Sequence, residues 1–226
     1  MIGIIFLLTF TTSNLFAMIP KDELLGKIDP KKHPDFVRIK SYNNSFWIRR
    51  EVAVKLIEMI EEAKKDGIEL KVISAFRSFS SQKNIWERKI KRFSAGKSKR
   101  EAVRETLKYS AMPGTSRHHW GTDVDLVSLE PSFYDTPYGR KVFLWLSRNA
   151  QRFGFFMPYS PNRKNKNGYK EEKWHWSYNP LAREFLSNYI EVISYKDLCG
   201  FTGCEFVEEF DIFSNFVLNI DEEEAK

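Results

Sequence analysis

The stretch TSRHHWGTDVDLV, residues 115–127, restricts what this chain can fold into more than any other segment. It holds two of the four histidines in 226 residues, followed by a glycine and by two aspartates that alternate with aliphatic residues. This alternation predicts a strand over residues 122–127, with Asp123 and Asp125 on one face. The segment is therefore either a surface loop that leads into a half-buried strand, or one part of a metal site whose other ligands lie elsewhere.

The surrounding sequence predicts helices that alternate irregularly with short strands. Hydrophobic periodicity and glycine stops indicate helices over residues 51–67 and 139–154. Ser78 is placed to cap a further helix, and Pro180 lies in the first turn of another. Strands are predicted over residues 68–76 and 171–178. The pattern indicates an α+β fold, a single domain with a small antiparallel sheet and flanking helices.

Composition and charge divide the chain into three parts. Residues 1–17 carry no charged side chain and contain an apolar run over residues 2–10, which predicts a signal peptide and export to the periplasm or cell-wall space. A retained membrane anchor is the alternative for this segment. The hydrophobic content of 42% suits a globular domain, predicted over residues 18–190. Residues 191–226, with ten acidic against two basic residues, form an acidic C-terminal extension.

The basic charge of the rest of the chain and its two cysteines exclude few classes of function. The basic body of the chain could attract nucleic acid or an anionic polymer such as a cell wall. The interpretation as a nucleic-acid enzyme would depend on charge alone, and we expect no nucleic-acid partner. Cys199 and Cys204 are too far apart for a CxxC redox motif, so we expect a structural disulfide or two free thiols.

A second segment, EEKWHW, supplies what a metal site would still need. A catalytic zinc ion takes three protein ligands and keeps one position open. His118 and Asp125 could supply two of them, since Gly121 lets the backbone turn tightly between them. His175 could be the third, with Glu172 nearby as a base. Residues three apart point to opposite faces of a strand, so Glu172 and His175 could share one water only if the segment twists or bulges.

These residue types suit metal-assisted hydrolysis. The metal lowers the pKa of a bound water to about 7, and a carboxylate takes its proton and later passes it to the leaving amine. Arg77, in SAFRSFSSQ, follows a predicted strand. Its planar guanidinium suits bidentate binding of a carboxylate.

The paired motifs resemble a known family. SRHHWGTDVD matches S-x-H-x-x-G-x-x-x-D, and EKWH matches E-x-W-H. With SAFRS, Gln82 and the earlier segment GKIDPKKHPDFVRI, they are similar to the signatures of VanY-type D-alanyl-D-alanine carboxypeptidases. Those are zinc peptidases in a wider group with lysostaphin-type enzymes and the hedgehog signalling domain. The likeness runs from about residue 25 to about residue 185.

The resemblance implies a role for each matching position. The zinc ligands would be His118, Asp125 and His175, and Glu172 would be the catalytic base. Arg77 would contact the substrate and stabilise the transition state. Ser78, Gln82 and Ser116 match positions that contact substrate or orient their neighbours.

One position departs from the family pattern, which more commonly has a small residue where this chain has Asp123. Asp123 shares a strand face with Asp125, so spacing alone leaves both as candidate ligands, and register with the motif favours Asp125. Asp123 would then accept a proton from a ligand imidazole. His119 is expected to point away from the metal, and Glu171 is a poorer match to the base than Glu172.

The sequence therefore predicts an exported, zinc-dependent carboxypeptidase that removes a terminal D-alanine from peptidoglycan stem peptides. Alternatives on the same wall peptides are an L,D-carboxypeptidase, a D,D-dipeptidase and an endopeptidase. An alternative of another class is a non-catalytic module that binds the cell wall. Membrane association is expected only if the N-terminal segment is retained, and the sequence does not indicate an oligomeric state.

Overall fold

The computed structural model describes residues 18–163 and 165–221. Residues 1–17, for which a signal peptide or anchor is predicted, lie outside the described residues. Within the described part of the chain, no helix is both long and apolar enough to cross a membrane.

The helices and strands follow one another in irregular order, as predicted. The α-helices are α1 (Lys21–Leu24), α2 (Arg50–Lys65), α3 (Phe79–Phe93), α4 (Lys99–Leu107), α5 (Pro137–Asn149) and α6 (Asn179–Val192). The strands are β1 (Phe36–Ser41), β2 (Asn44–Arg49), β3 (Val72–Ser74), β4 (Asp123–Leu126), β5 (Phe155–Phe156) and β6 (His175–Tyr178). Short turns of 3₁₀ or π-helix are η1 (Arg117–Trp120), η2 (Pro131–Asp135), η3 (Ala150–Phe153), η4 (Tyr195–Asp197), η5 (Cys204–Phe206) and η6 (Phe213–Val217).

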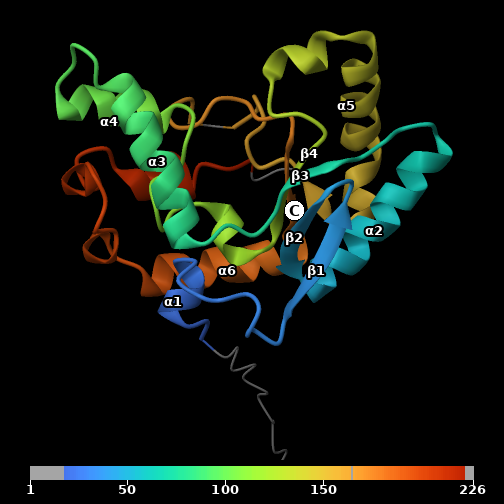
Figure 1. Ribbon diagram of the computed structural model, residues 1–226, viewed down its shortest axis with the longest axis horizontal. Helices are drawn as coiled ribbons and strands as arrows, with labels where there is room; N and C mark the ends of the chain where they lie inside the picture. Colours follow the sequence, from blue (N-terminus) through green and yellow to red (C-terminus); the bar gives the residue numbers. More distant parts are fainter. Residues whose placement is uncertain (1–17, 164, 222–226) are drawn as a thin grey trace, which may run out of the picture.

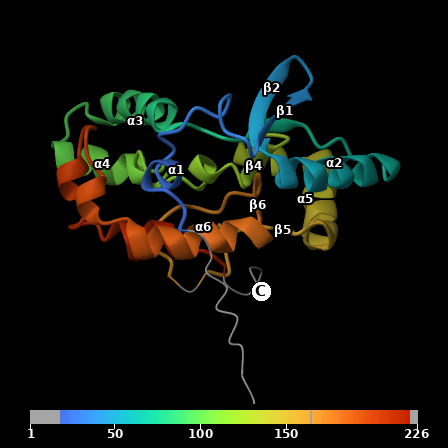
Figure 2. The ribbon, with the colours of Figure 1, turned by 90° about the horizontal axis from the view of Figure 1, so that it is seen from below.

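The central sheet is antiparallel throughout, with strand order β3-β4-β6-β5. A separate hairpin pairs β1 with β2. In Figure 1, α2 and α5 lie to one side of the sheet and α3 and α4 to the other, with α6 below. Figure 2 shows α3 and α6 along opposite sides of the molecule. The predicted α+β class with a small antiparallel sheet is confirmed.

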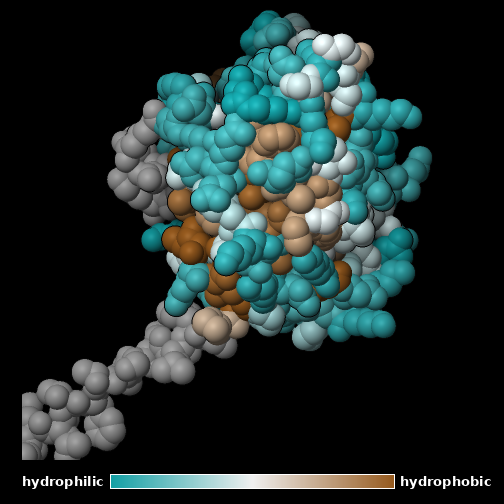
Figure 3. All heavy atoms as spheres, turned by 90° about the vertical axis from the view of Figure 1, so that its left-hand side faces the viewer, coloured by the Kyte–Doolittle hydropathy of each residue, from teal (hydrophilic) through white to brown (hydrophobic). Residues whose placement is uncertain are grey.

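The core consists of two clusters of buried apolar side chains. The first lies between α2, α5 and one face of the sheet, and includes Val124 and Trp176. The second joins α3, α4 and α6 to residues from the C-terminal part of the chain, including Phe201 and Phe216. Its partly buried members reach the surface, and Figure 3 shows apolar side chains among hydrophilic ones on the side where α3 and α4 lie.

The register of β4 against β6 decides which side chains share a face of the sheet. Asp125 pairs with His175 and Asp123 pairs with Ser177. Because directly opposed residues of an antiparallel pair project to the same side, the two aspartates and His175 lie on the face away from Val124 and Trp176. One face of the sheet thus packs into the core, and the opposite, polar face carries the candidate site.

The structure differs from the sequence-based expectation in four places. The β1–β2 hairpin was not predicted, and β3 is shorter than the strand expected over residues 68–76. β4 ends at Leu126, because Val127 has a left-handed φ of 66° that turns the chain out of the strand. The last predicted strand begins only at His175, so residues 171–174 are not part of it.

We predict that Gly121→Ala will destabilise the fold. Gly121 ends η1 with a φ of 71°, and a Cβ there would lie 2.6 Å from the Phe36 ring. The clash and the strained backbone together should cost about 1–3 kcal/mol in the free energy of unfolding, measured by denaturant titration. Gly96→Ala is the matched control, since its φ is 69° and a Cβ would meet nothing within 4 Å. Equal losses of unfolding free energy in the two variants would contradict a role for the close approach of Gly121 to the Phe36 ring.

Candidate metal centre

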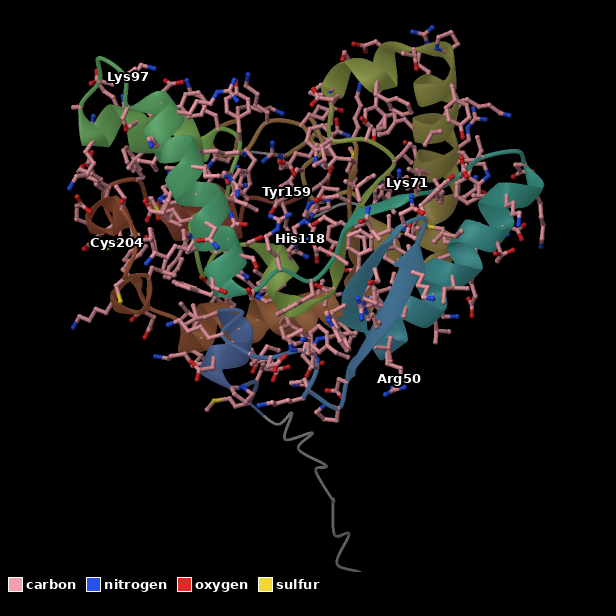
Figure 4. All side chains as sticks on the ribbon, in the orientation of Figure 1. Arg50, Lys71, Lys97, His118, Tyr159 and Cys204 are labelled. Carbon is pink, nitrogen blue, oxygen red and sulfur yellow. The ribbon has the colours of Figure 1, made fainter. Side chains whose placement is uncertain are left out.

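Three residues from separate parts of the chain form a group that could hold a metal ion. His118, Asp125 and His175 are buried, and one ligand atom of each lies within 4.8 Å of the others. His118 comes from η1, while Asp125 and His175 face each other across the β4–β6 pair. The two imidazole rings meet edge to face, with centroids 4.8 Å apart. In Figure 4, His118 lies near the centre of the molecule, between α3 and the β1–β2 hairpin.

Each histidine uses one ring nitrogen for a hydrogen bond that fixes its orientation. His118 Nδ1 donates to the backbone oxygen of Ala75 at 2.8 Å. His175 Nε2 donates to Asp123 Oδ2 at 2.8 Å. A ring with its proton on one nitrogen presents a lone pair on the other, so His118 Nε2 and His175 Nδ1 are the nitrogens left to bind a metal.

Both of these nitrogens lie beside Asp125. His118 Nε2 is 3.2 Å from Asp125 Oδ2, and His175 Nδ1 is 3.2 Å from Asp125 Oδ1. Oδ1 is buried and accepts no hydrogen bond from the described residues. Burial alone would raise the pKa of Asp125, but the two imidazoles hold it well below its usual range. Two lone pairs and a carboxylate around one small space fit a divalent cation, and the donor set of two nitrogens and one oxygen suits zinc.

Glu172 lies beside these ligands because the chain turns before β6. The His175 N–H donates to the Glu172 carbonyl at 3.1 Å, closing a turn that brings the two side chains to one side. Glu172 Oε2 is 3.6 Å from His175 Nδ1. Burial raises the pKa of Glu172 to about 7, with a further increase from Asp125 and an opposing effect from His175. On a regular strand Glu172 and His175 would point to opposite faces, and this turn is what brings their side chains together.

Arg77 is held at the edge of this group by fixed partners. Its Nη1 donates to Gln82 Oε1 at 2.8 Å, and its Nη2 donates to Ser74 Oγ at 2.9 Å. Nη2 also lies 3.6 Å from Asp125 Oδ2. Gln82 is fully buried and donates to the backbone oxygen of Ala111. Gln82 therefore orients the guanidinium from within the core.

The other candidate residues take structural positions around the site. Ser78 caps α3, as predicted, by accepting the Ser81 N–H. Ser116 is buried directly before η1. His119 turns away from the metal-binding group: its Nδ1 donates to the backbone oxygen of Arg77 and its Nε2 accepts the Gly114 N–H.

Asp123 lies behind His175 within a buried polar network. Besides His175 Nε2, its carboxylate accepts hydrogen bonds from Arg117 Nε at 2.9 Å and from the hydroxyl groups of Thr122 and Ser177. These donors occupy Asp123, so Asp125 is the aspartate that faces the metal-binding space. Arg117 was not predicted as part of the site, although its place directly before the histidine pair was a signal.

Tyr159 is a second neighbour that sequence reasoning missed. Its ring packs against His175 with centroids 4.8 Å apart, and its backbone oxygen accepts the Glu172 N–H at 3.2 Å. In the view of Figure 4, Tyr159 and His118 are both labelled in the central region of the molecule. No motif marks Tyr159, because its contact depends on the path of a long loop.

Comparison with known proteins assigns the family. A family model described as VanY, D-alanyl-D-alanine carboxypeptidase, matches residues 45–181. The chain belongs to the VanY family. Among its curated relatives, the putative carboxypeptidase YodJ of Bacillus subtilis is 34% identical over 179 residues, which is 73% of this chain and 60% of YodJ. The chain spans between about half and three fifths of the length of the curated relatives that it matches first.

Solved structures of VanY proteins share the fold. VanYB in complex with D-alanine-D-alanine is 27% identical, with a TM-score of 0.55 that covers 72% of this chain and 92% of that one. A variant of the vancomycin resistance D,D-pentapeptidase VanY in complex with Zn(II) is 28% identical, with a TM-score of 0.53, covering 64% of this chain and 80% of that one.

The two aspartates give a matched test of the metal site. We predict that Asp125→Asn will abolish zinc binding at micromolar zinc, because it removes the charge from the metal-binding space. Asp123→Asn should keep one zinc per chain and lower the affinity by about tenfold to hundredfold, as for other partners of ligand imidazoles. Competition with a chromogenic chelator measures both affinities. Weaker zinc binding in Asp123→Asn than in Asp125→Asn would make Asp123 the metal ligand and Asp125 the supporting residue.

Proposed function

We propose that this VanY-family chain is a zinc-dependent carboxypeptidase that removes a terminal D-alanine from peptidoglycan stem peptides. The observation that carries the proposal is the convergence of His118, Asp125 and His175 beside the partly buried carboxyl group of Glu172. It is supported by the VanY structures that contain Zn(II) and D-alanine-D-alanine.

The proposed zinc ligands are His118 Nε2, His175 Nδ1 and a carboxylate oxygen of Asp125. A zinc ion held by them supplies Lewis acidity that activates water near neutral pH. The protein contributes the orientation of the ligands, since the second nitrogen of each imidazole is already bonded to Ala75 or Asp123. Their burial keeps bulk water from competing for these positions.

Glu172 is the proposed general base and then general acid. Desolvation of the partly buried side chain raises its pKa to about 7, where a carboxyl group both accepts and returns a proton readily. The carboxylate takes a proton from the water that attacks the scissile carbonyl. It then returns that proton to the nitrogen of the departing D-alanine, which leaves as a neutral amine.

Arg77 is the proposed contact for the substrate. Its guanidinium is preorganised by Gln82 and Ser74, so little conformational entropy is lost when it binds an anionic oxygen. Ser78 and Ser116 remain proposed substrate neighbours from the resemblance. A peptidoglycan substrate also agrees with the proposed export of the chain, for which residues 1–17 are the candidate signal.

Glu172→Gln should separate chemistry from metal binding. The amide keeps the size of the side chain but cannot accept the proton, so we expect zinc content near one per chain and a loss of kcat of at least about a hundredfold. His175→Ala should lose both zinc and hydrolysis. Metal analysis and a D-alanine release assay measure the two properties. Full activity in Glu172→Gln would remove this residue from its proposed role.

Defined stem peptides decide between the proposed activity and its alternatives. Pentapeptide and tetrapeptide stems are incubated with purified protein, with and without a chelator, and the products are read by mass. We expect loss of one D-alanine from the pentapeptide only, abolished by the chelator and restored by zinc. Loss from the tetrapeptide would indicate an L,D-carboxypeptidase, and hydrolysis of free D-alanine-D-alanine, tested as a third substrate, without cleavage of the stems would indicate a D,D-dipeptidase. Binding without any cleavage would indicate the non-catalytic module.

A further inference from the structure

The loop that carries Glu172 is long and has little regular structure of its own. It connects β5 to β6 through residues 157–163 and 165–174 and bears both Tyr159 and Glu172. We refer to it as the Glu172 loop. The Tyr159 backbone oxygen accepts the Glu172 N–H, which ties the two ends of the loop together. A loop of this length needs contacts from outside to hold one conformation.

A buried arginine supplies part of this restraint. Arg163 Nε donates to the backbone oxygen of Ser160 at 3.0 Å, and its Nη2 donates to the backbone oxygen of Tyr169 at 2.5 Å. Its Nη1 donates to the backbone oxygen of Asn219 at 3.5 Å. The guanidinium therefore links two points of the Glu172 loop to the C-terminal part of the chain.

The C-terminal residues contact the Glu172 loop at several further points. Asn219 Nδ2 donates to the backbone oxygen of Asn167, and Asn215 Oδ1 accepts from Asn165 Nδ2 at 3.0 Å. The Asp221 N–H donates to the Pro158 oxygen at 2.9 Å, at the start of the loop.

Packing adds to these hydrogen bonds. The Phe216 ring meets the Tyr169 ring with centroids 5.0 Å apart, and Tyr169 in turn meets Tyr159, also at 5.0 Å. Gly168 has a φ of 100°, and a Cβ on it would lie 2.1 Å from the Asn215 oxygen, so the two backbones touch. A row of aromatic rings thus runs from the C-terminal residues through Tyr159 to His175.

We propose that residues 213–221 brace the Glu172 loop and thereby hold Glu172 at the metal centre, with Asn219 and Phe216 as positioning residues. This inference rests on the proposed role of Glu172. The brace lies beyond residues 45–181, the part of the chain that the VanY family model matches. Part of the proposed catalytic geometry therefore depends on a segment outside the residues that the family model matches.

The test compares Asn219→Ala and Phe216→Leu with the wild-type protein. Asn219→Ala removes the amide that holds Asn167, and Phe216→Leu removes the ring contact while keeping an apolar side chain. Asn84→Ala is the matched control, because Asn84 is exposed on α3 and belongs neither to residues 213–221 nor to the Glu172 loop. Each full-length, zinc-loaded protein is measured for kcat, KM, zinc content and amide hydrogen exchange of residues 157–172.

We expect both variants to keep one zinc per chain and to lose at least about tenfold in kcat, with a smaller change in KM. Amide exchange of the Glu172 loop should accelerate, and the control should match the wild type. Unchanged kcat in the folded variants would overturn the inference, whether or not exchange accelerates. If Asn219→Ala does not fold, Phe216→Leu decides by the same criteria.

Failure of the proposed function would be recognised separately. If the wild-type protein cleaves no stem peptide, that function fails. The exchange measurement then still decides whether the brace exists: faster exchange in Asn219→Ala supports it, and unchanged exchange refutes it.

Discussion

The pairing of β4 with β6 is the constraint on which the rest of the site depends. Asp125 lies directly opposite His175, and Asp123 opposite Ser177, so a single strand register sets both the metal-binding group and its support. A slip of one residue would turn every one of these side chains to the other face. The apolar residues between them, Val124 and Trp176, are buried in the core, and their burial opposes such a slip.

The buried polar network behind His175 makes the site costly to alter. Arg117 and Asp123 form an ion pair with almost no exposure, and the guanidinium also stacks 4.8 Å from the centre of the Trp120 ring. Taking two charges out of water is unfavourable, and the loss of one partner leaves the other charge buried and unpaired. The benefit of this network lies in fixing the His175 ring, because Asp123 determines which nitrogen carries the proton.

Local signals predicted part of the metal site, and the choice of His118, Asp125 and His175 came from the resemblance to the VanY motifs. The alternation over residues 122–127 placed Asp123 and Asp125 on one face, and Ser78 marked the start of α3. The position of Glu172 could not be predicted in this way. It depends on a turn closed by the His175 N–H, and turn geometry in a long loop depends on tertiary contacts.

The C-terminal part of the chain shows a different limit of prediction from sequence. Its acidic composition sets it apart from the rest of the chain but does not indicate its structure, and the predicted boundary at residue 190 stays a prediction. Yet Ile193, Leu198, Phe201 and Phe216 are buried in the second core cluster. The apolar spacing at Phe213, Phe216 and Val217 was the available signal, and the surrounding charge obscured it. Cys199 and Cys204 are both free thiols.

The central claim is that one ion is shared by three side chains. Anomalous diffraction at the zinc absorption edge, on crystals of the zinc-loaded protein, tests it most directly. The account predicts one anomalous peak at about 2.0–2.2 Å from His118 Nε2, His175 Nδ1 and a carboxylate oxygen of Asp125. A stoichiometric zinc ion bound away from these three atoms would contradict it.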